Sequence, residues 1–365
     1  MTRNVPRILC INPGSTSTKV AVFEGEAELF SEEITHAKAD IDACGTVQGQ
    51  LSLRRGAVAQ AVSRHSGGSR FDAVAGRGGL LRPLPGGVYA VDQPMLDDLA
   101  QARFGEHPCN LGAPLAQEFA AGSGCPAFVV DPPVTDELRE VARLTGLPRI
   151  RRRSVFHALS QRSAARRAAT DLGLRYEDAK FVVAHLGGGV SVGAHDKGRI
   201  VDVTNGVDGE GPMSAERAGS LPSLALLKLV QRGEDPAALC RELLTTSGLF
   251  ALAGTNDLRV IETRALAGDR ESEALVHTLA YNVAKSVAAM ASPLFEEDAA
   301  PVAAVVLTGG MVKSALLAAA IKRRVCWLAQ VVLLPEVEEM RALAAGALAA
   351  LAGAEAVRRY GREGG

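Results

Sequence analysis

Three turns rich in glycine and hydroxyl residues have the composition of phosphate-binding loops. They are NPGSTSTK at 12–19, HLGGGVSVG at 185–193 and LTGGMVKS at 307–314. Backbone N–H groups in a tight turn form a concave anion site, to which hydroxyls and a lysine add donors. Glycine also dominates ordinary turns, but three such turns in one chain favour phosphate binding. The expected contacts are Gly14, Ser15, Thr16, Ser17 and Lys19 in the first loop, Gly187, Gly188 and Gly189 in the second, and Gly309 and Gly310 in the third.

Cationic side chains occur beside glycines and near the predicted ends of elements. Arg77 follows an apolar run in AVAGRGGLL, and Arg217 lies in the loop DGEGPMSAERAGSLP. His107 follows Gly-Glu, and His157 lies in the first turn of a predicted helix. A surface ion pair or a hydrogen-bonded core histidine explains any one of them. Together they favour a site for an anionic substrate.

Carboxylates at two positions are candidates for a metal site. Asp131 ends the apolar run PAFVV, and Glu338 and Glu339 lead the last predicted helix. Mg²⁺ takes one or two carboxylates together with phosphate oxygens and water. A glutamate in the first turn of a helix also stabilises the helix dipole, so that reading stays open for the two glutamates.

An internal repeat relates two of the loops. RILCINPGSTSTKVAVFEGE at the start returns in outline as KFVVAHLGGGVSVGAHDKGR at 180–199. Each copy has an apolar run, a polar residue (Asn12 or His185), a polar or Gly-rich turn and an alternating strand that closes on Gly25 or Gly198. This is the pattern of a β-hairpin. The repeat predicts two related domains, each with a hairpin loop that faces a shared cleft.

Predicted strands alternate with predicted helices over the rest of the chain. Strands are expected at FDAVAGRGGLL (with a glycine-rich exit), PAFVVDPPV, VAAVVL and QVVLLP. Helices are expected at MLDDLAQARF, LGAPLAQEFAAG, SVFHALSQRSAARRAATDLG, SLALLKLVQRG, PAALCRELLTTSG, ALVHTLAYNVAKSVAAMASPLF, MVKSALLAAAIKRRV and EEMRALAAGALAALAGAEAVRR. Ser154 is the expected N-cap of the long helix that carries His157. Alternation of this kind indicates an α/β fold. Neither a P-loop motif nor a dinucleotide-binding motif after the first strand occurs, which disfavours both of those classes.

Composition excludes several other classes. The chain has 365 residues, of which 47% are hydrophobic, and its formal net charge is -1. With no overall positive charge, binding to nucleic acid or to an anionic membrane surface is not indicated. Six scattered cysteines without zinc spacing are typical of a reducing compartment. With no signal peptide or membrane-length apolar run, the expected location is the cytoplasm.

Together these motifs resemble the acetate/butyrate kinase family, and its butyrate kinase branch in particular. The segments that carry the resemblance occur in the expected order over nearly the whole chain: INPGSTSTKVAV, GEHPCNLGAPLA, RRRSVFHALSQRSAARR, HLGGGVSVGAHDKGRIVDVTNGVDGEGPMSAERAGSLP, GTNDLR and LTGGMVKS. The resemblance implies the two-domain fold of actin, Hsp70 and the sugar kinases, with duplicated βββαβαβα cores and a central ATP cleft. It also implies transfer of phosphate between ATP and a short-chain carboxylate, and at least a dimer.

The resemblance assigns roles to particular positions. Asn12 matches the asparagine of the first phosphate loop, and Arg77 and Arg217 match the two active-site arginines. His157 matches the histidine that contacts the transferring phosphoryl group, and His185 heads the second loop. Gly309 and Gly310 are expected to cradle the adenosine.

The family also implies Mg²⁺, linked to Asp131 and to one glutamate, for which Glu339 is preferred over Glu338. The final helix returns to the first domain in this fold. The domains are therefore expected at 1–155 with 340–365, and at 156–339.

Asparagine at position 12 suits a carboxylate acceptor. A sugar hydroxyl must lose a proton to attack phosphorus, so sugar kinases use a carboxylate base. A fatty acid is already ionised at neutral pH, and its difficulty is repulsion from the triphosphate. An amide can donate to phosphate oxygens, Arg77 can pair with the carboxylate, and Arg217 with His157 can stabilise the transition state.

The acyl chain is expected to be longer than acetate. Acetate members have a bulky aliphatic residue two places after the first arginine, where this chain has Gly79. The missing side chain opens volume for methylenes worth about 0.8 kcal/mol each when buried, unless the glycine serves backbone geometry. Phe156 and His107 are expected beside this pocket. Butyrate or isobutyrate is favoured, acetate or propionate is the alternative, and a chaperone-like ATPase is the alternative of another class.

Overall fold

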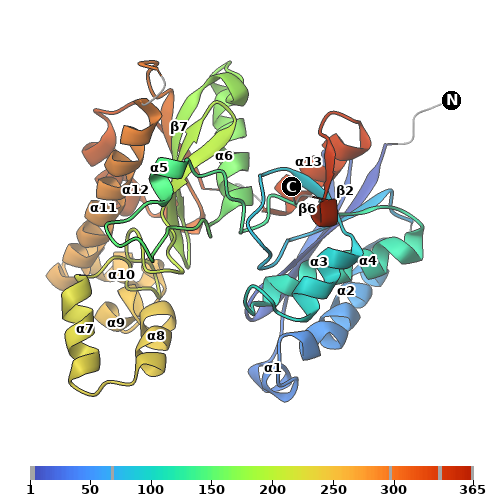
Figure 1. Ribbon diagram of the computed structural model, residues 1–365, viewed down its shortest axis with the longest axis horizontal. Helices are drawn as coiled ribbons and strands as arrows, with labels where there is room; N and C mark the ends of the chain where they lie inside the picture. Colours follow the sequence, from blue (N-terminus) through green and yellow to red (C-terminus); the bar gives the residue numbers. More distant parts are fainter. Residues whose placement is uncertain (1–4, 67–69, 296–297, 336–338, 363–365) are drawn as a thin grey trace. The chain divides into compact units, whose positions relative to one another are not determined.

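The computed structural model describes residues 5–66, 70–295, 298–335 and 339–362 and divides them into two compact units (Figure 1). Unit 1 is formed by residues 1–135 and 338–365, and unit 2 by residues 136–337. The α/β architecture expected from the sequence is confirmed in both units. Unit 1 is thus assembled from two separate stretches of the chain.

Unit 1 is built on a mixed sheet with the order β12-β5-β6-β4-β1-β2-β3. Its strands are β1 (Arg7–Pro13), β2 (Ser17–Glu24), β3 (Ala27–Thr35), β4 (Ala73–Gly76), β5 (Val88–Ala90), β6 (Ala127–Val130) and β12 (Val357–Arg359). Its helices are α1 (Lys38–Ala43), α2 (Leu51–Ser66), α3 (Gln93–Ala100), α4 (Gly112–Ser123) and α13 (Glu339–Leu351).

Unit 2 has a sheet with the order β11-β10-β7-β8-β9. Its strands are β7 (Lys180–Leu186), β8 (Val190–Asp196), β9 (Arg199–Val203), β10 (Ala304–Thr308) and β11 (Val331–Leu334). Its helices are α5 (Glu140–Arg143), α6 (Ala158–Asp171), α7 (Ser223–Gln231), α8 (Pro236–Thr245), α9 (Gly248–Ala253), α10 (Leu258–Leu266), α11 (Arg270–Ala291) and α12 (Ala315–Val325).

The two units repeat one plan. In each, an antiparallel meander (β1-β2-β3 or β7-β8-β9) continues into parallel strands beside its first strand. One sheet face carries the helices that connect these strands, α2 and α4 in unit 1 and α11 and α12 in unit 2. The other face is covered by a helix that lies outside this run of strands, α13 in unit 1 and α6 in unit 2. The hairpin repeat in the sequence therefore reflects a duplicated fold.

Because side chains along a central strand alternate between the two faces of the sheet, the strand contacts the helices on both faces. Val182 and Ala184 of β7 pack in one cluster with α11 and α12, whereas Phe181 and Val183 pack with α6 in another. Successive side chains of a strand point to opposite faces. A strand covered on both faces must be apolar throughout, as KFVVAHL nearly is.

The boundary between the units differs from the expected one at 155/156. Residues 136–155 pack with unit 2, because Leu138 joins a buried cluster with Ile200 and Val203, and Arg139 pairs with Asp196 at 2.6 Å. The helix that carries His157 also begins later than expected. His157 occupies its N-cap position and α6 starts at Ala158, so Ser154 does not cap it.

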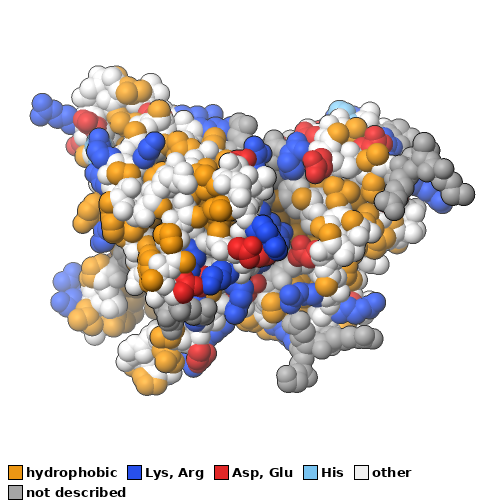
Figure 2. All heavy atoms as spheres, turned by 90° about the horizontal axis from the view of Figure 1, so that it is seen from above, with side chains coloured by type: hydrophobic (Ala, Val, Ile, Leu, Met, Phe, Trp, Pro, Cys, Tyr) orange, Lys and Arg blue, Asp and Glu red, His pale blue; other side chains and the backbone are white. Residues whose placement is uncertain are grey.

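The surface is electrostatically mixed. On the face that Figure 2 shows, Lys and Arg side chains lie among Asp, Glu and apolar side chains. This agrees with the formal net charge of -1. Within the described residues, no helix is long and apolar enough to span a bilayer.

Candidate active site

The first phosphate loop is the turn of the β1–β2 hairpin. Asn12 pairs with Lys19 across the hairpin, and Gly14 N donates to Ser17 O at 2.8 Å. Ser15 and Thr16 at the tip are exposed. The side chains of Ser17 and Lys19 contact Glu33 on β3, at 2.7 and 3.6 Å. As phosphate ligands in this loop, the backbone and the two tip hydroxyls are thus better placed than Ser17 Oγ or Lys19.

A buried arginine holds this loop from beneath. Arg54 of α2 is fully buried, and its guanidinium donates to Ser17 O at 2.8 Å, Thr18 Oγ1 at 3.0 Å and the Gln50 side chain at 2.8 Å. Burial lowers the pKa of this guanidinium. Sequence patterns do not indicate this role, since Arg54 and its exposed neighbour Arg55 occur in the same local context.

Asn12, Arg77 and Glu339 converge within unit 1. Asn12, buried at the end of β1, donates from Nδ2 to Glu339 Oε2 at 2.6 Å. Arg77, just after β4, donates from Nη1 to Glu339 Oε1 and Oε2 at 3.0 and 2.8 Å. Parallel β1 and β4 bring the first two residues together, and α13 delivers the third. Glu338 lies outside the described residues.

Two groups in this cluster have unused hydrogen-bonding capacity. Among the described residues, Asn12 Oδ1 is buried without a partner. Arg77 carries five N–H donors, and within the described part of the chain its side-chain hydrogen bonds come from Nη1 alone. The Nε–Nη2 edge of Arg77 has the fork geometry that pairs with a carboxylate.

The region around Gly79 is closely packed. A Cβ on Gly79 would lie 2.6 Å from Asn110 Cα and 2.6 Å from Leu99 Cδ2. Asn110 is itself fixed, because it accepts from Leu80 N at 2.8 Å and donates to Gly105 O at 2.9 Å. The expected opening of acyl volume at Gly79 is therefore wrong in this structure. Glycine is needed there for the close approach of the backbone segments.

The other two expected pocket residues also have structural partners. Phe156 is buried in the cluster of Leu138, Ile200 and Val203 in unit 2, so it packs in a core. His107 Nδ1 accepts from Cys109 N at 3.2 Å and lies 3.0 Å from Cys109 Sγ. Burial raises the pKa of the Cys109 thiol to about 11, although Arg77 nearby acts in the opposite direction.

Asp131 follows β6 in a strained conformation. Its φ is 39°, a region that residues other than glycine seldom adopt. Its carboxylate accepts from Gly87 N at 2.9 Å, and its own N–H donates to Gly87 O at 3.0 Å. Strain of this kind gathers at functional sites. No group of three or more His, Cys, Asp or Glu side chains suited to a metal occurs among the residues described.

In unit 2, two histidines and an arginine surround the second phosphate loop. The rings of His157 and His185 stack with centroids 4.0 Å apart. A Cβ on Gly189 would lie 3.2 Å from Arg217 Nη1 and 3.2 Å from His157 Cε1. Glycine at 189 thus lets the backbone approach both side chains.

The guanidinium of Arg217 is half-buried, and burial lowers its pKa. Within the described residues it makes no side-chain hydrogen bond or ion pair. A desolvated cation without a bound anion is costly. Arg217 is therefore suited to an anionic ligand at the Gly189 turn.

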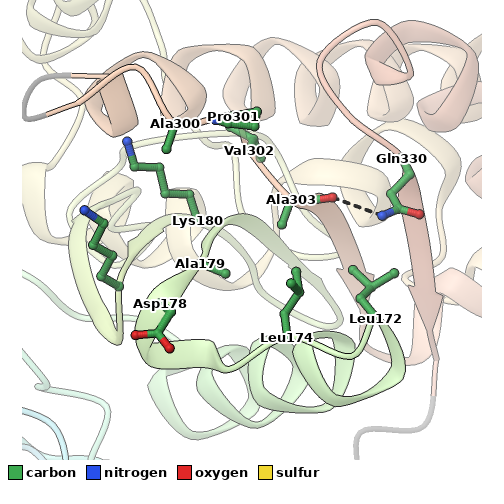
Figure 3. Close-up of a pocket in the computed structure, with 11 residues that line it drawn as sticks. Leu172, Leu174, Asp178, Ala179, Lys180, Ala300, Pro301, Val302, Ala303 and Gln330 are labelled. Carbon is green, nitrogen blue, oxygen red and sulfur yellow. Dashed lines mark hydrogen bonds between the residues drawn. The ribbon is translucent and has the colours of Figure 1, made fainter.

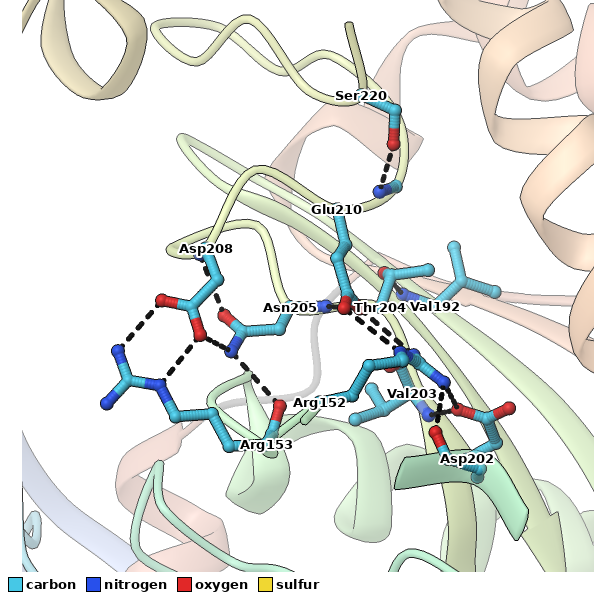
Figure 4. A network of polar contacts seen from close by, with 12 residues as sticks. Arg152, Arg153, Val192, Asp202, Val203, Thr204, Asn205, Asp208, Glu210 and Ser220 are labelled. Atoms are coloured by element: carbon cyan, nitrogen blue, oxygen red, sulfur yellow. Dashed lines mark hydrogen bonds and ion pairs between the residues drawn. The ribbon is translucent and has the colours of Figure 1, made fainter. Parts of the chain in front are cut away.

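A network of ion pairs anchors the loop that leads to Arg217 (Figure 4). Arg152 contacts Asp202 at 2.9 Å and Glu210 at 2.9 Å, and Arg153 contacts Asp208 at 2.7 Å. Asn205 bridges the backbone of Arg153 and the Asp208 carboxylate. Arg152 and Arg153 thus hold this loop in place, whereas Arg149 and Arg151 of the same basic run are exposed.

The third loop follows β10. At Gly309, with φ of 95°, a Cβ would lie 2.4 Å from Leu186 O, whereas a Cβ on Gly310 would have no atom within 4 Å. Gly309 thus allows close packing on the second loop, and Gly310 faces open space. Both loops follow the carboxyl ends of neighbouring parallel strands, β7 and β10, where ligands bind in open α/β sheets.

A cavity of about 480 Å³ lies elsewhere in unit 2 (Figure 3). Its lining includes Lys180 at the start of β7, and Ala303 and Gln330 directly before β10 and β11. This is the amino end of the same parallel strands. The cavity therefore lies at the opposite end of these strands from the second and third phosphate loops.

Comparisons with known proteins agree with this arrangement. The model of the acetokinase family matches residues 145–343. Proteins named probable butyrate kinase from Oleidesulfovibrio alaskensis and Maridesulfovibrio salexigens are 51% and 46% identical, each over 97% of this chain and 98% of its own length.

Two solved structures share the fold. Porphyromonas gingivalis acetate kinase has a TM-score of 0.74 at 18% identity, covering 95% of this chain and 100% of that one. Entamoeba histolytica acetate kinase has a TM-score of 0.70 at 16% identity, covering 93% and 98%. The resemblance drawn from the loops, the two arginines and the histidines is thereby confirmed, and the chain belongs to the acetokinase family.

Proposed function

We propose that this chain is a butyrate kinase, which transfers a phosphoryl group reversibly between ATP and butyrate to give ADP and butyryl phosphate. The observation that carries the proposal is the half-buried Arg217, which lies with His157 against Gly189 and whose side chain makes no ion pair or hydrogen bond in the described part of the chain. The relatives named probable butyrate kinase support butyrate over other acids.

The proposed reaction needs positive charge and no general base. Butyrate is ionised at neutral pH, so its oxygen attacks without losing a proton. We assign the Nε–Nη2 edge of Arg77 to the butyrate carboxylate. Arg217 and the His157 imidazole stabilise charge on the transferring phosphoryl oxygens, and the three glycine loops hold the nucleotide.

The metal of the reaction is proposed to be Mg²⁺. Glu339 and the unpartnered Asn12 Oδ1 are hard oxygen donors, which suit this ion, and Asp131 is a third oxygen donor in unit 1. When bound, Mg²⁺ neutralises charge on the phosphates. Asn12 and Arg77 hold the Glu339 carboxylate in place.

We also propose that the protein works in the cytoplasm, where ATP is available, and that it forms at least a dimer.

A hydroxamate trap for acyl phosphate tests this function. Purified protein with ATP and Mg²⁺ is assayed with acetate, propionate, butyrate, isobutyrate and valerate. We expect kcat/KM to be highest with butyrate. If kcat/KM is highest with acetate or isobutyrate, that acid is the preferred substrate and the assignment to butyrate is wrong. ATP hydrolysis without any acyl phosphate would favour a chaperone-like ATPase.

The Arg217→Gln variant assigns the activity to this site. Loss of one preorganised donor to transition-state charge typically lowers kcat by about 10²–10³. Arg232→Gln, on the exposed C-terminal end of α7, is the control and should leave kcat unchanged.

A further inference from the structure

Behind His157 lies a chain of polar side chains. His157 Nδ1 is 2.9 Å from Ser191 Oγ, and Ser191 Oγ is 2.8 Å from Gln161 Nε2. Gln161 Oε1 is 3.1 Å from His195 Nε2, and His195 Nδ1 is 2.9 Å from the Tyr176 hydroxyl. The four residues behind His157 come from α6, β8 and the turn before β7, and all are buried.

The orientation of Gln161 is fixed by the backbone. Its Nε2 atom lies 3.1 Å from Ser191 O, a carbonyl that can only accept. The atom at that position must therefore be the amide nitrogen. Its Oε1 faces His195 Nε2, so His195 must carry a proton on Nε2.

His195 is fixed from its other side. It is fully buried, and burial followed by Arg162 lowers its pKa well below the usual value. A neutral ring with its proton on Nε2 accepts at Nδ1, so the Tyr176 hydroxyl donates to it. The Tyr176 hydroxyl thus donates to His195, His195 donates to Gln161, and Gln161 donates to Ser191.

The Ser191 hydroxyl then has one place for its proton. Its oxygen already accepts from Gln161 Nε2, and His157 Nδ1 is the acceptor within its reach among the described residues. A His157 that donated from Nδ1 would leave a buried hydroxyl hydrogen without an acceptor, which is destabilising. Ser191 therefore donates to Nδ1, and the proton of His157 is on Nε2.

We propose that Ser191 and Gln161 are positioning residues that fix His157 as a neutral imidazole with its Nε2–H as the donor. This Nε2 atom is 3.5 Å from the Cβ position of Gly189, and Arg217 Nη1 is 3.2 Å from the same position. An imidazolium has no acceptor atom, so an Nδ1 that accepts from Ser191 requires a neutral His157 ring. What Nε2–H contacts, a phosphoryl oxygen, rests on the proposed function, whereas the tautomer does not.

Long-range ¹H–¹⁵N spectra of histidine-labelled protein test the tautomer directly. The chain has seven histidines, and the signals absent from His157→Gln identify those of His157. We expect a protonated Nε2 and an unprotonated Nδ1 in the unaltered protein without nucleotide. An Nδ1–H tautomer there would overturn the proposal, whether or not the protein phosphorylates butyrate.

Two variants test the chain behind His157. In Gln161→Glu the carboxylate accepts the Ser191 proton, so His157 must donate from Nδ1 and the tautomer inverts. In Ser191→Ala the fixed donor is gone, and both tautomers should appear. Ser272→Ala, a buried serine at the start of α11, is the control. An unchanged His157 spectrum in both variants would refute the role of the chain.

Kinetics separate positioning from a merely structural role. Partners that orient a metal-ligating histidine are typically worth about 10- to 100-fold in activity, and we expect the lower end of this range for a histidine that contacts phosphate. We expect Ser191→Ala to lower kcat by about tenfold with little change in KM for ATP. A raised KM with unchanged kcat would contradict the proposal. If Gln161→Glu does not fold, Ser191→Ala alone carries the test.

Discussion

Arg77 Nη1 donates to both carboxylate oxygens of Glu339, at 3.0 and 2.8 Å, although the two residues are 262 positions apart in the chain. The pair is partly exposed, with about a fifth of each side chain accessible. It orients the guanidinium through one nitrogen, so that the Nε–Nη2 edge is available to a second carboxylate. This arrangement assigns different edges of one arginine to the protein and to the substrate.

Arg77→Lys should therefore raise KM for butyrate more than KM for ATP. Lysine keeps the charge but loses the planar fork, so it can serve Glu339 or the substrate but not both in two-point geometry. Hydrogen bonds to charged groups are worth about 1.5–3 kcal/mol, so we expect kcat/KM for butyrate to fall about 10- to 100-fold. Arg103→Lys, exposed and in the same unit, is the control. Equal rises in both KM values would contradict the assignment.

Glu339→Gln should shift the Mg²⁺ dependence of the reaction. The variant keeps the shape of the side chain and can still contact Asn12, but it removes the charge that suits a divalent cation. We expect half-maximal activity at a Mg²⁺ concentration about tenfold higher or more. The measurement is acyl phosphate formation over a Mg²⁺ titration, with Glu118→Gln on α4 as the control. An unchanged titration curve would show that Glu339 serves only to hold Asn12 and Arg77.

Sequence patterns predicted the elements and the loops well, because both depend on local rules. Apolar alternation located the two hairpins, and glycine located the turn at Gly309, where a positive φ and contact with Leu186 require it. Helix α2 was not predicted, since polar and small residues interrupt its apolar stripe in LSLRRGAVAQAVSRHS. The last helix was predicted too long: α13 ends at Leu351, and Val357–Arg359 form strand β12, because they pair with the distant strand β5.

Contacts between distant segments could not be predicted from patterns alone. Nothing near Arg54 marks it as buried, because its partners Ser17 and Thr18 belong to another element. Gly79 shows the same limit, because its neighbours in space could not be predicted from the sequence either. Its lack of a side chain suggested open volume, but the space is filled by Asn110 and Leu99, which the chain brings there from elsewhere.

Gly79→Ala distinguishes packing from pocket shape. A Cβ 2.6 Å from Asn110 Cα overpacks the site, and overpacking costs about 1–3 kcal/mol. We expect lower stability in urea and reduced activity with every acid. Gly56→Ala is the matched control, since its Cβ meets no atom within 4 Å in an exposed part of α2, and it should stabilise by about 0.5–1 kcal/mol. Selective loss of butyrate with retained acetate activity would instead place Gly79 in the acyl pocket.

Arg54→Met should weaken ATP binding through the first loop. The substitution leaves Ser17 O and Thr18 Oγ1 without the donor that holds them, and it removes a buried positive charge beneath the turn. We expect KM for ATP to rise about tenfold and stability to fall by about 1–3 kcal/mol. Arg55→Met, its exposed neighbour, should change neither. A loss of stability with unchanged KM would show that Arg54 supports only the fold.

Unit 2 should lose stability as the pH falls below about 6.5, because His195 is held neutral. Burial, with Arg162, lowers its pKa in the folded state, so below the ordinary value of about 6.5 the unfolded chain binds a proton that the folded chain does not. Stability is therefore full above pH 6.5 and declines toward the lowered pKa. The unfolding free energy should therefore be lower at pH 5.5 than at pH 7.5. The single tryptophan, Trp327, lies in unit 2, so its fluorescence during urea unfolding follows this unit.

The His195→Asn variant should have a shallower dependence of stability on pH than the unaltered protein. The control His65→Asn, at an exposed position in unit 1, should have the same dependence as the unaltered protein. Equal dependence in His195→Asn would show that another group titrates.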